Sequence, residues 1–141
     1  LKSYFNVQGI GKWVLGRHWR RASARERAEY LGLFEDLIVN NYAQRFKGYS
    51  NEKIKLMGTA SRGQTAIVKS VIERAGQKPI RVDWRVTYPD GRYKIFDIVV
   101  EGVSMIQTQR SEFSSVIRRS GGKISGLIKT LKNKSGAASK N

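Results

Sequence analysis

The sequence predicts an α+β fold in which a curved four-stranded antiparallel sheet is covered by about four helices, in the order ααββββαα. Helical periodicity marks the first part of the chain, strand-like alternation marks the middle, and helical periodicity returns in the last third. Strands that follow one another through short turns pair antiparallel, and segregated helices cover one face of such a sheet. The 141 residues suit one domain, which we expect over 1–132, followed by a flexible basic tail over 133–141.

Two helices are predicted before the strands. The first follows a cap at Asn6, carries an apolar stripe and ends near Gly16. The second begins at Ser23 and Glu26, whose spacing lets a hydroxyl and a carboxylate each bond the other's free main-chain amide. Apolar residues then recur every three or four positions, so one long amphipathic helix is predicted over about 24–46.

Four strands are predicted in the middle of the chain. Residues 80–88 alternate strictly between apolar and polar side chains, as expected of a strand with one buried face. Two earlier runs, 53–58 and 65–74, have the character of strands as well. The turn Pro89-Asp90-Gly91 leads into the fourth strand, which ends near Val100.

A three-residue loop at this turn would fix the pairing of the third and fourth strands. Trp84 would then face Phe96, and the apolar residues of both strands would share one face of the sheet. The same register places Asp83 opposite Asp97 on the other face. Paired carboxylates can do acid–base chemistry, but arginines flank Asp83 on that face, which favours a salt-bridged outer surface.

The run from Ile95 to Ile106 is apolar on both faces of a strand, apart from Asp97 and Glu101. A central strand covered on both sides explains this composition. A cavity larger than a packed core needs, of the kind that takes a lipophilic ligand, explains it equally well. Helical stripes over 103–117 and 124–131 follow this run.

The chain is strongly basic. Lys and Arg total 27 against 11 Asp and Glu, a formal net charge of +16, so an anionic partner or surface is the first to consider. The excess gathers in residues 12–27 and 118–141. Trp13 lies on the apolar stripe of the first helix, so we expect it in the core rather than stacked on a base. No helix-turn-helix, RNP-like or zinc-finger spacing is present, and a solvated basic face is the simpler interpretation.

The residue inventory excludes several chemistries. Without any Cys, the chain has no thiol catalysis and no thiolate metal site. The single histidine, His18, cannot build a site of two or more imidazoles. A catalytic histidine needs a partner that orients it, and the neighbours of His18 are arginines. We therefore expect an ordinary histidine at the surface or at a helix end.

One segment resembles a known family. The run Phe96–Ile106, followed by Arg110–Phe113, is similar to the strand-to-helix signature of the MlaC, or toluene-tolerance, family of periplasmic phospholipid-binding proteins. The resemblance extends over about residues 4–132. Further blocks occur in the order of that family, at residues 4–7, 14–20, 31–34, 82–85 and 122–128.

The resemblance implies a carrier rather than an enzyme. It suggests a sheet of the NTF2-like or cystatin-like kind, no catalytic residue, no metal, and no cofactor other than a lipid as cargo. Such a carrier would be a periplasmic monomer whose signal peptide has been removed. It would take phospholipid between an outer-membrane lipoprotein resembling MlaA and an inner-membrane ABC transporter complex with a subunit resembling MlaD, without binding nucleic acid.

The resemblance implies that the acyl chains would lie in a pocket between the sheet and the helices, with the lipid headgroup at the opening of that pocket. We expect the lining to come from the strand face and the following helix, and the headgroup or docking contacts to come from arginines. The expected lipid-binding residues are Val82, Trp84, Val86, Phe96, Ile98, Val100, Met105, Ile106 and Phe113. The expected headgroup or docking residues are Arg17, Arg20, Arg21, Arg118 and Arg119.

Three alternatives stay open from the sequence. Another apolar lipid, such as a hopanoid, could be the cargo. An NTF2-like enzyme would need a carboxylate that faces the cavity beside Trp84. A basic binder of nucleic acid or of a membrane surface would lose its ligand steeply with added salt, whereas a buried lipid would not.

Overall fold

The computed structural model describes residues 4–47, 53–88 and 91–139. The chain divides into two compact units, each with its own set of internal contacts. We call residues 1–10 and 49–108 the sheet unit, and residues 11–48 and 109–141 the helix unit. The single domain expected over 1–132 stays a prediction.

Five helices and five strands follow one another along the described residues, where the sequence predicts about four of each. The additional elements are a short second helix and a two-residue fifth strand. In chain order the elements are α1 (Val7–Leu15), α2 (Arg17–Arg21), α3 (Ala24–Lys47), β1 (Lys53–Arg62), β2 (Thr65–Glu73), β3 (Ile80–Thr87), β4 (Lys94–Val100), β5 (Val103–Ser104), α4 (Met105–Arg119) and α5 (Ile124–Ser139).

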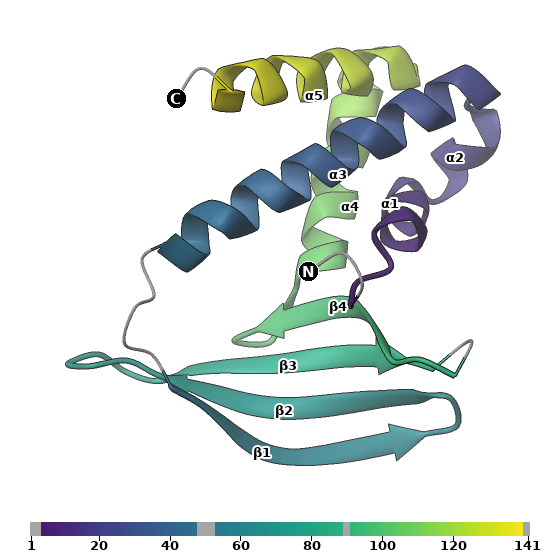
Figure 1. Cartoon of the computed structure of the whole chain (residues 1–141). Coiled ribbons are helices and arrows are strands. Elements are labelled where there is room, and N and C mark those ends of the chain that lie inside the picture. The colour runs from purple at the N-terminus through teal and green to yellow at the C-terminus, as the bar shows by residue number, and fades with distance from the viewer. Residues whose placement is uncertain (1–3, 48–52, 89–90, 140–141) are drawn as a thin grey trace. The chain divides into compact units, whose positions relative to one another are not determined.

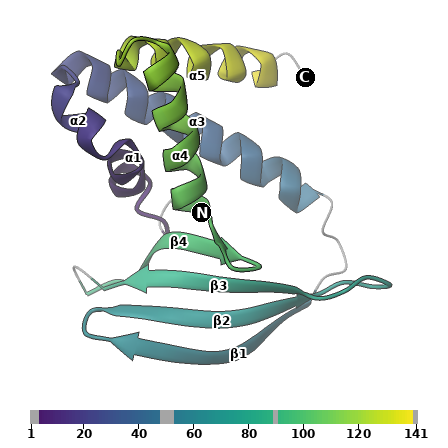
Figure 2. The same cartoon turned by 180° about the vertical axis from the view of Figure 1, so that it is seen from behind.

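The sheet of the sheet unit is antiparallel throughout, and its strands lie in sequence order from β1 to β5. Figures 1 and 2 show β1, β2, β3 and β4 side by side from opposite directions. This confirms the predicted antiparallel sheet. The fifth strand arises because the chain turns back at Gly102, which has a φ of 82°, and pairs briefly with the end of β4.

The predicted register between β3 and β4 is wrong by two residues from Val82 to Arg85, and by one residue at Val86 and Thr87. Trp84 pairs with Ile98 rather than Phe96, and the ladder ends where Thr87 pairs with Lys94. The connection is therefore longer than the assumed three-residue loop; its residues 89–90 lie outside the described residues. Because a shift by two preserves the alternation of faces, the apolar residues of both strands still share one face.

The predicted pairing of Asp83 with Asp97 is also wrong. Asp83 pairs with Val99, and Asp97 pairs with Arg85. Beyond that pair the register shifts, so that Phe96 is the extra residue of a β-bulge. The expectation of ion pairs on this face is correct, since Arg81 Nε lies 3.7 Å from an Asp83 oxygen.

Asp97 is only 5% exposed, and its carboxylate holds the start of α4. Oδ1 accepts hydrogen bonds from the main-chain N–H groups of Ile98 at 2.8 Å and Ile106 at 3.1 Å. Oδ2 accepts the hydroxyl of Ser104 at 2.5 Å and lies 3.8 Å from Arg85 Nη1. A buried carboxylate is stable only with such partners, so Asp97 joins β4, β5 and the first turn of α4.

The core of the helix unit centres on three aromatic rings, those of Tyr30, Phe34 and Phe113. Tyr30 and Phe34 stack with ring centroids 5.8 Å apart, and Phe113 meets them edge-on at 6.3 and 6.2 Å. The Tyr30 hydroxyl donates to the carbonyl of Gly11 at 2.7 Å. A Cβ at Gly11 would lie 2.9 Å from a ring carbon of Phe34, so this glycine lets α1 pack closely on α3.

The close approach at Gly11 corrects the prediction for Trp13. The buried residues of α1 are Gly11, Val14 and Leu15, and Trp13 is 56% exposed. The sequence predicts Trp13 in the core because it lies on the apolar stripe of the first helix. In the structure Gly11 faces the core instead, because only a residue without a side chain fits beside Phe34.

The predicted helix starts are confirmed. Asn6 accepts the Gly9 N–H at 3.1 Å, and Ser23 and Glu26 exchange side-chain to main-chain bonds at 3.0 and 3.1 Å. At the other end of the chain, α5 continues to Ser139, through most of the segment expected to be a flexible tail.

Replacement of Asp97 by Ala should lower the free energy of unfolding by roughly 2–3 kcal/mol, because buried N–H groups lose a charged acceptor. The matched control is Asp83→Ala, which removes a carboxylate whose ion pair is with a largely exposed arginine and should lose less than about 1 kcal/mol. Urea denaturation of both variants measures the difference. Equal losses would contradict the capping role of Asp97.

Candidate functional site: an apolar sheet face and a basic pocket

One face of the sheet is apolar from β1 to β4. Paired positions in adjacent strands present their side chains to the same face, so the register defines its rows. One row contains Ile54, Ile72 and Ile80, and the next contains Leu56, Ser70, Val82 and Val100. The third contains Thr59, Val68, Trp84 and Ile98, and the fourth contains Ser61, Ala66, Val86 and Ile95.

The one buried polar side chain in these rows, Ser70, is internally satisfied. The Ser70 hydroxyl donates to the carbonyl of Val82 at 2.7 Å and accepts the Trp84 Nε1–H at 3.0 Å. Ser70 is 1% exposed, so neither it nor the indole nitrogen offers a free polar group. The rows therefore form a mainly apolar surface, whose other polar side chains, Thr59 and Ser61, lie on the exposed strand β1.

The predicted lipid-binding residues fall in two places. Val82, Trp84, Val86, Ile98 and Val100 lie on the apolar face just described. Phe96 lies at the bulge of β4 and opposes no residue in the register. Met105 and Ile106 begin α4 within the sheet unit, whereas Phe113 belongs to the helix unit and its aromatic core.

Sequence reasoning missed the part of this face that β1 contributes. Ile54 and Leu56 are 60% and 70% exposed, and they extend the rows to the edge of the sheet. The alternation of apolar residues with Lys53 and Lys55 could have revealed them. It did not, because the sequence does not show which strand lies beside which row.

The predicted headgroup or docking arginines all lie in the helix unit and are exposed. Arg17, Arg20 and Arg21 belong to α2, and Arg118 and Arg119 end α4. Cations at the end of a helix are favoured by its dipole. The neighbouring Trp19 lies under two further cations, those of Lys12 and Arg27.

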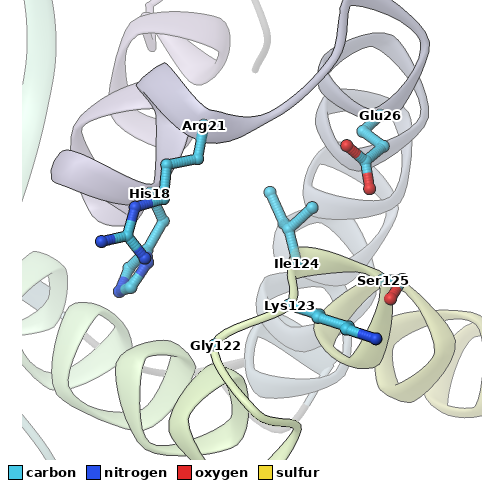
Figure 3. A pocket seen from close by; sticks show the side chains of 7 residues that line it. All are labelled: His18, Arg21, Glu26, Gly122, Lys123, Ile124 and Ser125. Carbon is cyan, nitrogen blue, oxygen red and sulfur yellow. The ribbon is translucent and has the colours of Figure 1, made fainter.

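A pocket of 290 Å³ lies within the helix unit. Figure 3 shows His18 and Arg21, from α2, on one side of it and the first residues of α5 on another, with Glu26 at the start of α3. Its lining residues are His18, Arg21, Glu26, Gly122, Lys123, Ile124 and Ser125.

His18 is buried, with 5% of its surface exposed, so the expectation of a surface histidine is wrong. Its Nδ1 has no hydrogen-bond partner among the described residues. Burial lowers the pKa of His18, and the nearby charges of Arg17 and Arg21 lower the pKa further. The imidazole is therefore held in its neutral form.

Among the described residues, no group of three or more His, Asp and Glu side chains could hold a metal ion. Within the same residues, none of the helices combines the length and apolar character that crossing a membrane requires.

Comparison with known proteins decides the family. The sequence model of the family described as "MlaC protein" matches residues 1–133 of the chain. The chain belongs to the MlaC family. A curated relative from Haemophilus influenzae, the intermembrane phospholipid transport system binding protein MlaC, is 29% identical over 126 residues. The match covers 86% of this chain but only 59% of the length of that relative.

A solved structure is similar to this MlaC-family chain as well. It is the phospholipid-binding protein from Ralstonia solanacearum in complex with a phospholipid, with a TM-score of 0.88 and 20% sequence identity. The alignment covers 99% of this chain and 78% of that one. Because the sequence identity is 20%, this similarity establishes the fold of the chain.

The free energy of unfolding of this MlaC-family chain should fall as the pH is lowered through about 6.5, because the unfolded chain protonates His18 more readily than the folded one. The slope for one proton cannot exceed about 1.4 kcal/mol per pH unit. Urea denaturation between about pH 8 and pH 5.5, above the carboxylate range, measures it. His18→Asn should flatten this dependence; an unchanged slope in that variant would refute the assignment to His18.

Proposed function

We propose that this MlaC-family chain is part of a periplasmic carrier that binds phospholipid acyl chains and shuttles them between membrane components. The apolar sheet face is the single observation that carries the proposal. It extends over β1, β2, β3 and β4, and its buried serine, Ser70, is internally hydrogen-bonded. Family membership and the names of its relatives support a phospholipid as the cargo.

The energetics of such a carrier are favourable. Burying about 30 chain methylenes at about 0.8 kcal/mol each is worth about 24 kcal/mol against water. Against a bilayer, which is already apolar, the same transfer changes the free energy little. A protein with an apolar binding face can therefore load and release a lipid at membranes without losing it to the solvent.

The remaining expected lining residues are Phe96, Met105, Ile106 and Phe113. In this proposal Phe96, Met105 and Ile106, which belong to the sheet unit, extend the contact with the acyl chains beyond the sheet face. The exposed arginines Arg17, Arg20, Arg21, Arg118 and Arg119 provide contacts to the headgroup or to anionic membrane surfaces. The partners are an outer-membrane lipoprotein resembling MlaA and a transporter subunit resembling MlaD, and the carrier itself acts as a monomer.

An NTF2-like enzyme is the weaker alternative. It would need a carboxylate beside Trp84, and the register puts Asp83 and Asp97 on the opposite face. Both oxygens of Asp97 are also engaged by main-chain and Ser104 donors. We therefore propose that the chain performs no chemistry on its cargo, whether this is a phospholipid or another apolar lipid such as a hopanoid.

The protein purified from its exported, full-length form should contain lipid. Extraction with organic solvent and mass spectrometry should identify about one lipid per protein, retained after washing with high salt because an apolar contact is not screened. A ligand that is lost steeply with added salt would instead indicate a binder of nucleic acid or of a membrane surface. Lipid-free extracts would count against carriage.

Leu56→Glu tests the apolar face directly. Leu56 is 70% exposed, so the substitution should leave folding intact, yet it places a charge where acyl chains would lie. We expect the lipid content to fall at least several-fold. The matched control is Lys55→Glu, the adjacent residue of β1 on the other face of the sheet, which should retain its lipid. Equal lipid content in the two variants would exclude β1 from the binding face.

A further inference from the structure

Three exposed tyrosines gather at one end of the sheet. Tyr88 directly follows β3 and Tyr93 directly precedes β4, and they are 43% and 68% exposed. Their ring centroids lie 4.6 Å apart. Tyr4 is 65% exposed, and its carbonyl accepts the Ile95 N–H at 2.7 Å. Main-chain bonding to the sheet therefore brings exposed aromatic rings from three segments of the sheet unit to this end.

The tyrosines continue the apolar sheet face. Val86 pairs with Ile95 in the fourth row of that face. Tyr88 lies two positions beyond the first of these residues, and Tyr93 lies two positions before the second. Side chains two positions apart along a strand point to the same face, and the contact between the two rings agrees with this placement. Together with Tyr4 they form a border at the end of the apolar face, which we call the tyrosine rim.

Cations lie beside the tyrosine rim. The Tyr88 N–H donates to the Gln64 carbonyl at 3.1 Å, which holds the turn between β1 and β2 next to the rim. Figures 1 and 2 show this turn and the β3–β4 connection at the same end of the sheet. Arg62, the last residue of β1, and Arg92 are both exposed. Lys94, the first residue of β4, adds a third cation.

The charge at this end is positive. The described residues 62–65, 87–88 and 91–94 contain these three cations and no carboxylate. Asp90 lies outside the described residues, and its one negative charge still leaves the cations in excess. An exposed positive surface attracts anions, and those nearest a lipid-binding face are the phosphates of lipids.

The opposite end of the sheet has neither property to the same degree. Lys53 and residues 73–79 and 101–103 contain three cations and two carboxylates, so most of the charge is offset. The same residues contain no aromatic side chain. Exposed rings and uncompensated positive charge are therefore combined at the end of the tyrosine rim and not at the other end.

We propose that the tyrosine rim docks the sheet unit on the surface of an anionic lipid bilayer. Tyrosine suits this position because its ring is apolar and its hydroxyl is polar, and such side chains favour the headgroup region of membranes. A second copy of the chain is disfavoured there, because each copy carries a formal net charge of +16. This docking role rests on the proposed lipid carriage: a lipid that leaves the bilayer would reach the apolar face without crossing water.

Fluorescence from single labelled positions tests which end of the sheet meets the membrane. Because the chain has no cysteine, Gln64→Cys and Gln77→Cys in the full chain each accept one environment-sensitive fluorophore. Both glutamines are exposed, the first between β1 and β2 and the second between β2 and β3. On vesicles of equal parts phosphatidylglycerol and phosphatidylcholine, the label in Gln64→Cys should shift to the blue and that in Gln77→Cys should not. Equal shifts, or none in Gln64→Cys, would overturn the proposal.

Matched variants separate a defined surface from general attraction to a basic protein. In co-sedimentation with the same vesicles, Tyr93→Ser should weaken binding roughly fivefold or more, because an interfacial ring is lost. Val103→Ser removes an apolar side chain that is 57% exposed at the opposite end and should have a much smaller effect. Arg92→Gln should weaken binding about fivefold, and Lys78→Gln, at the opposite end, much less. Equal losses within either pair would refute the docking surface.

Failure of docking and failure of carriage give different results. The lipid content of each variant is measured by the extraction described above. Tyr93→Ser that retains its lipid but binds vesicles weakly supports a docking surface distinct from the lipid site, whereas a parallel loss of lipid would place Tyr93 in that site and contradict docking. Wild-type protein that contains lipid and does not bind anionic vesicles would retain carriage, overturn membrane docking and leave a protein partner for this end.

Discussion

A single buried carboxylate organises the sheet unit. Asp97 is only 5% exposed. Its carboxylate therefore needs hydrogen-bond partners within the protein, because burying a charge without partners is very unfavourable. It accepts bonds from Ile98, Ser104 and Ile106, which fixes the end of β4, the brief return as β5 and the start of α4. With β4 held in this way, Ile98 and Val100 fall on the same face as Trp84.

This arrangement explains how the sheet presents an apolar surface while remaining a folded unit. Charged residues such as Arg81 and Asp83 are confined to the opposite face, where they pair. On the apolar face the serine of β2 and the indole of Trp84 satisfy each other. The rows continue onto β1, whose Ile54 and Leu56 stay largely exposed. An apolar surface that reaches an edge strand suits a large flexible ligand better than a closed core would.

The helix unit has a different character. Its three aromatic rings form a packed core, made possible by the absence of a side chain at Gly11. Around this core lie exposed arginines of α2 and of the end of α4. The imidazole of His18 is also buried in this unit, and burial together with neighbouring cations lowers its pKa and favours its neutral form. The aromatic side chains thus pack inside this unit, and the charged arginine side chains lie on its surface.

The sequence alone determined the kinds of element, their order, the caps at Asn6 and Ser23, and the apolar alternation of β3, because these depend on residues only two to four positions apart. It also contained the family signature that the comparisons confirm. Tertiary structure decided the register of β4, the burial of His18 and Asp97, the exposure of Trp13 and the participation of β1. These depend on a bulge, on a close helix contact and on which strands are neighbours. The alternation in β1 is the local sign of its participation, but long-range packing decides which rows it extends.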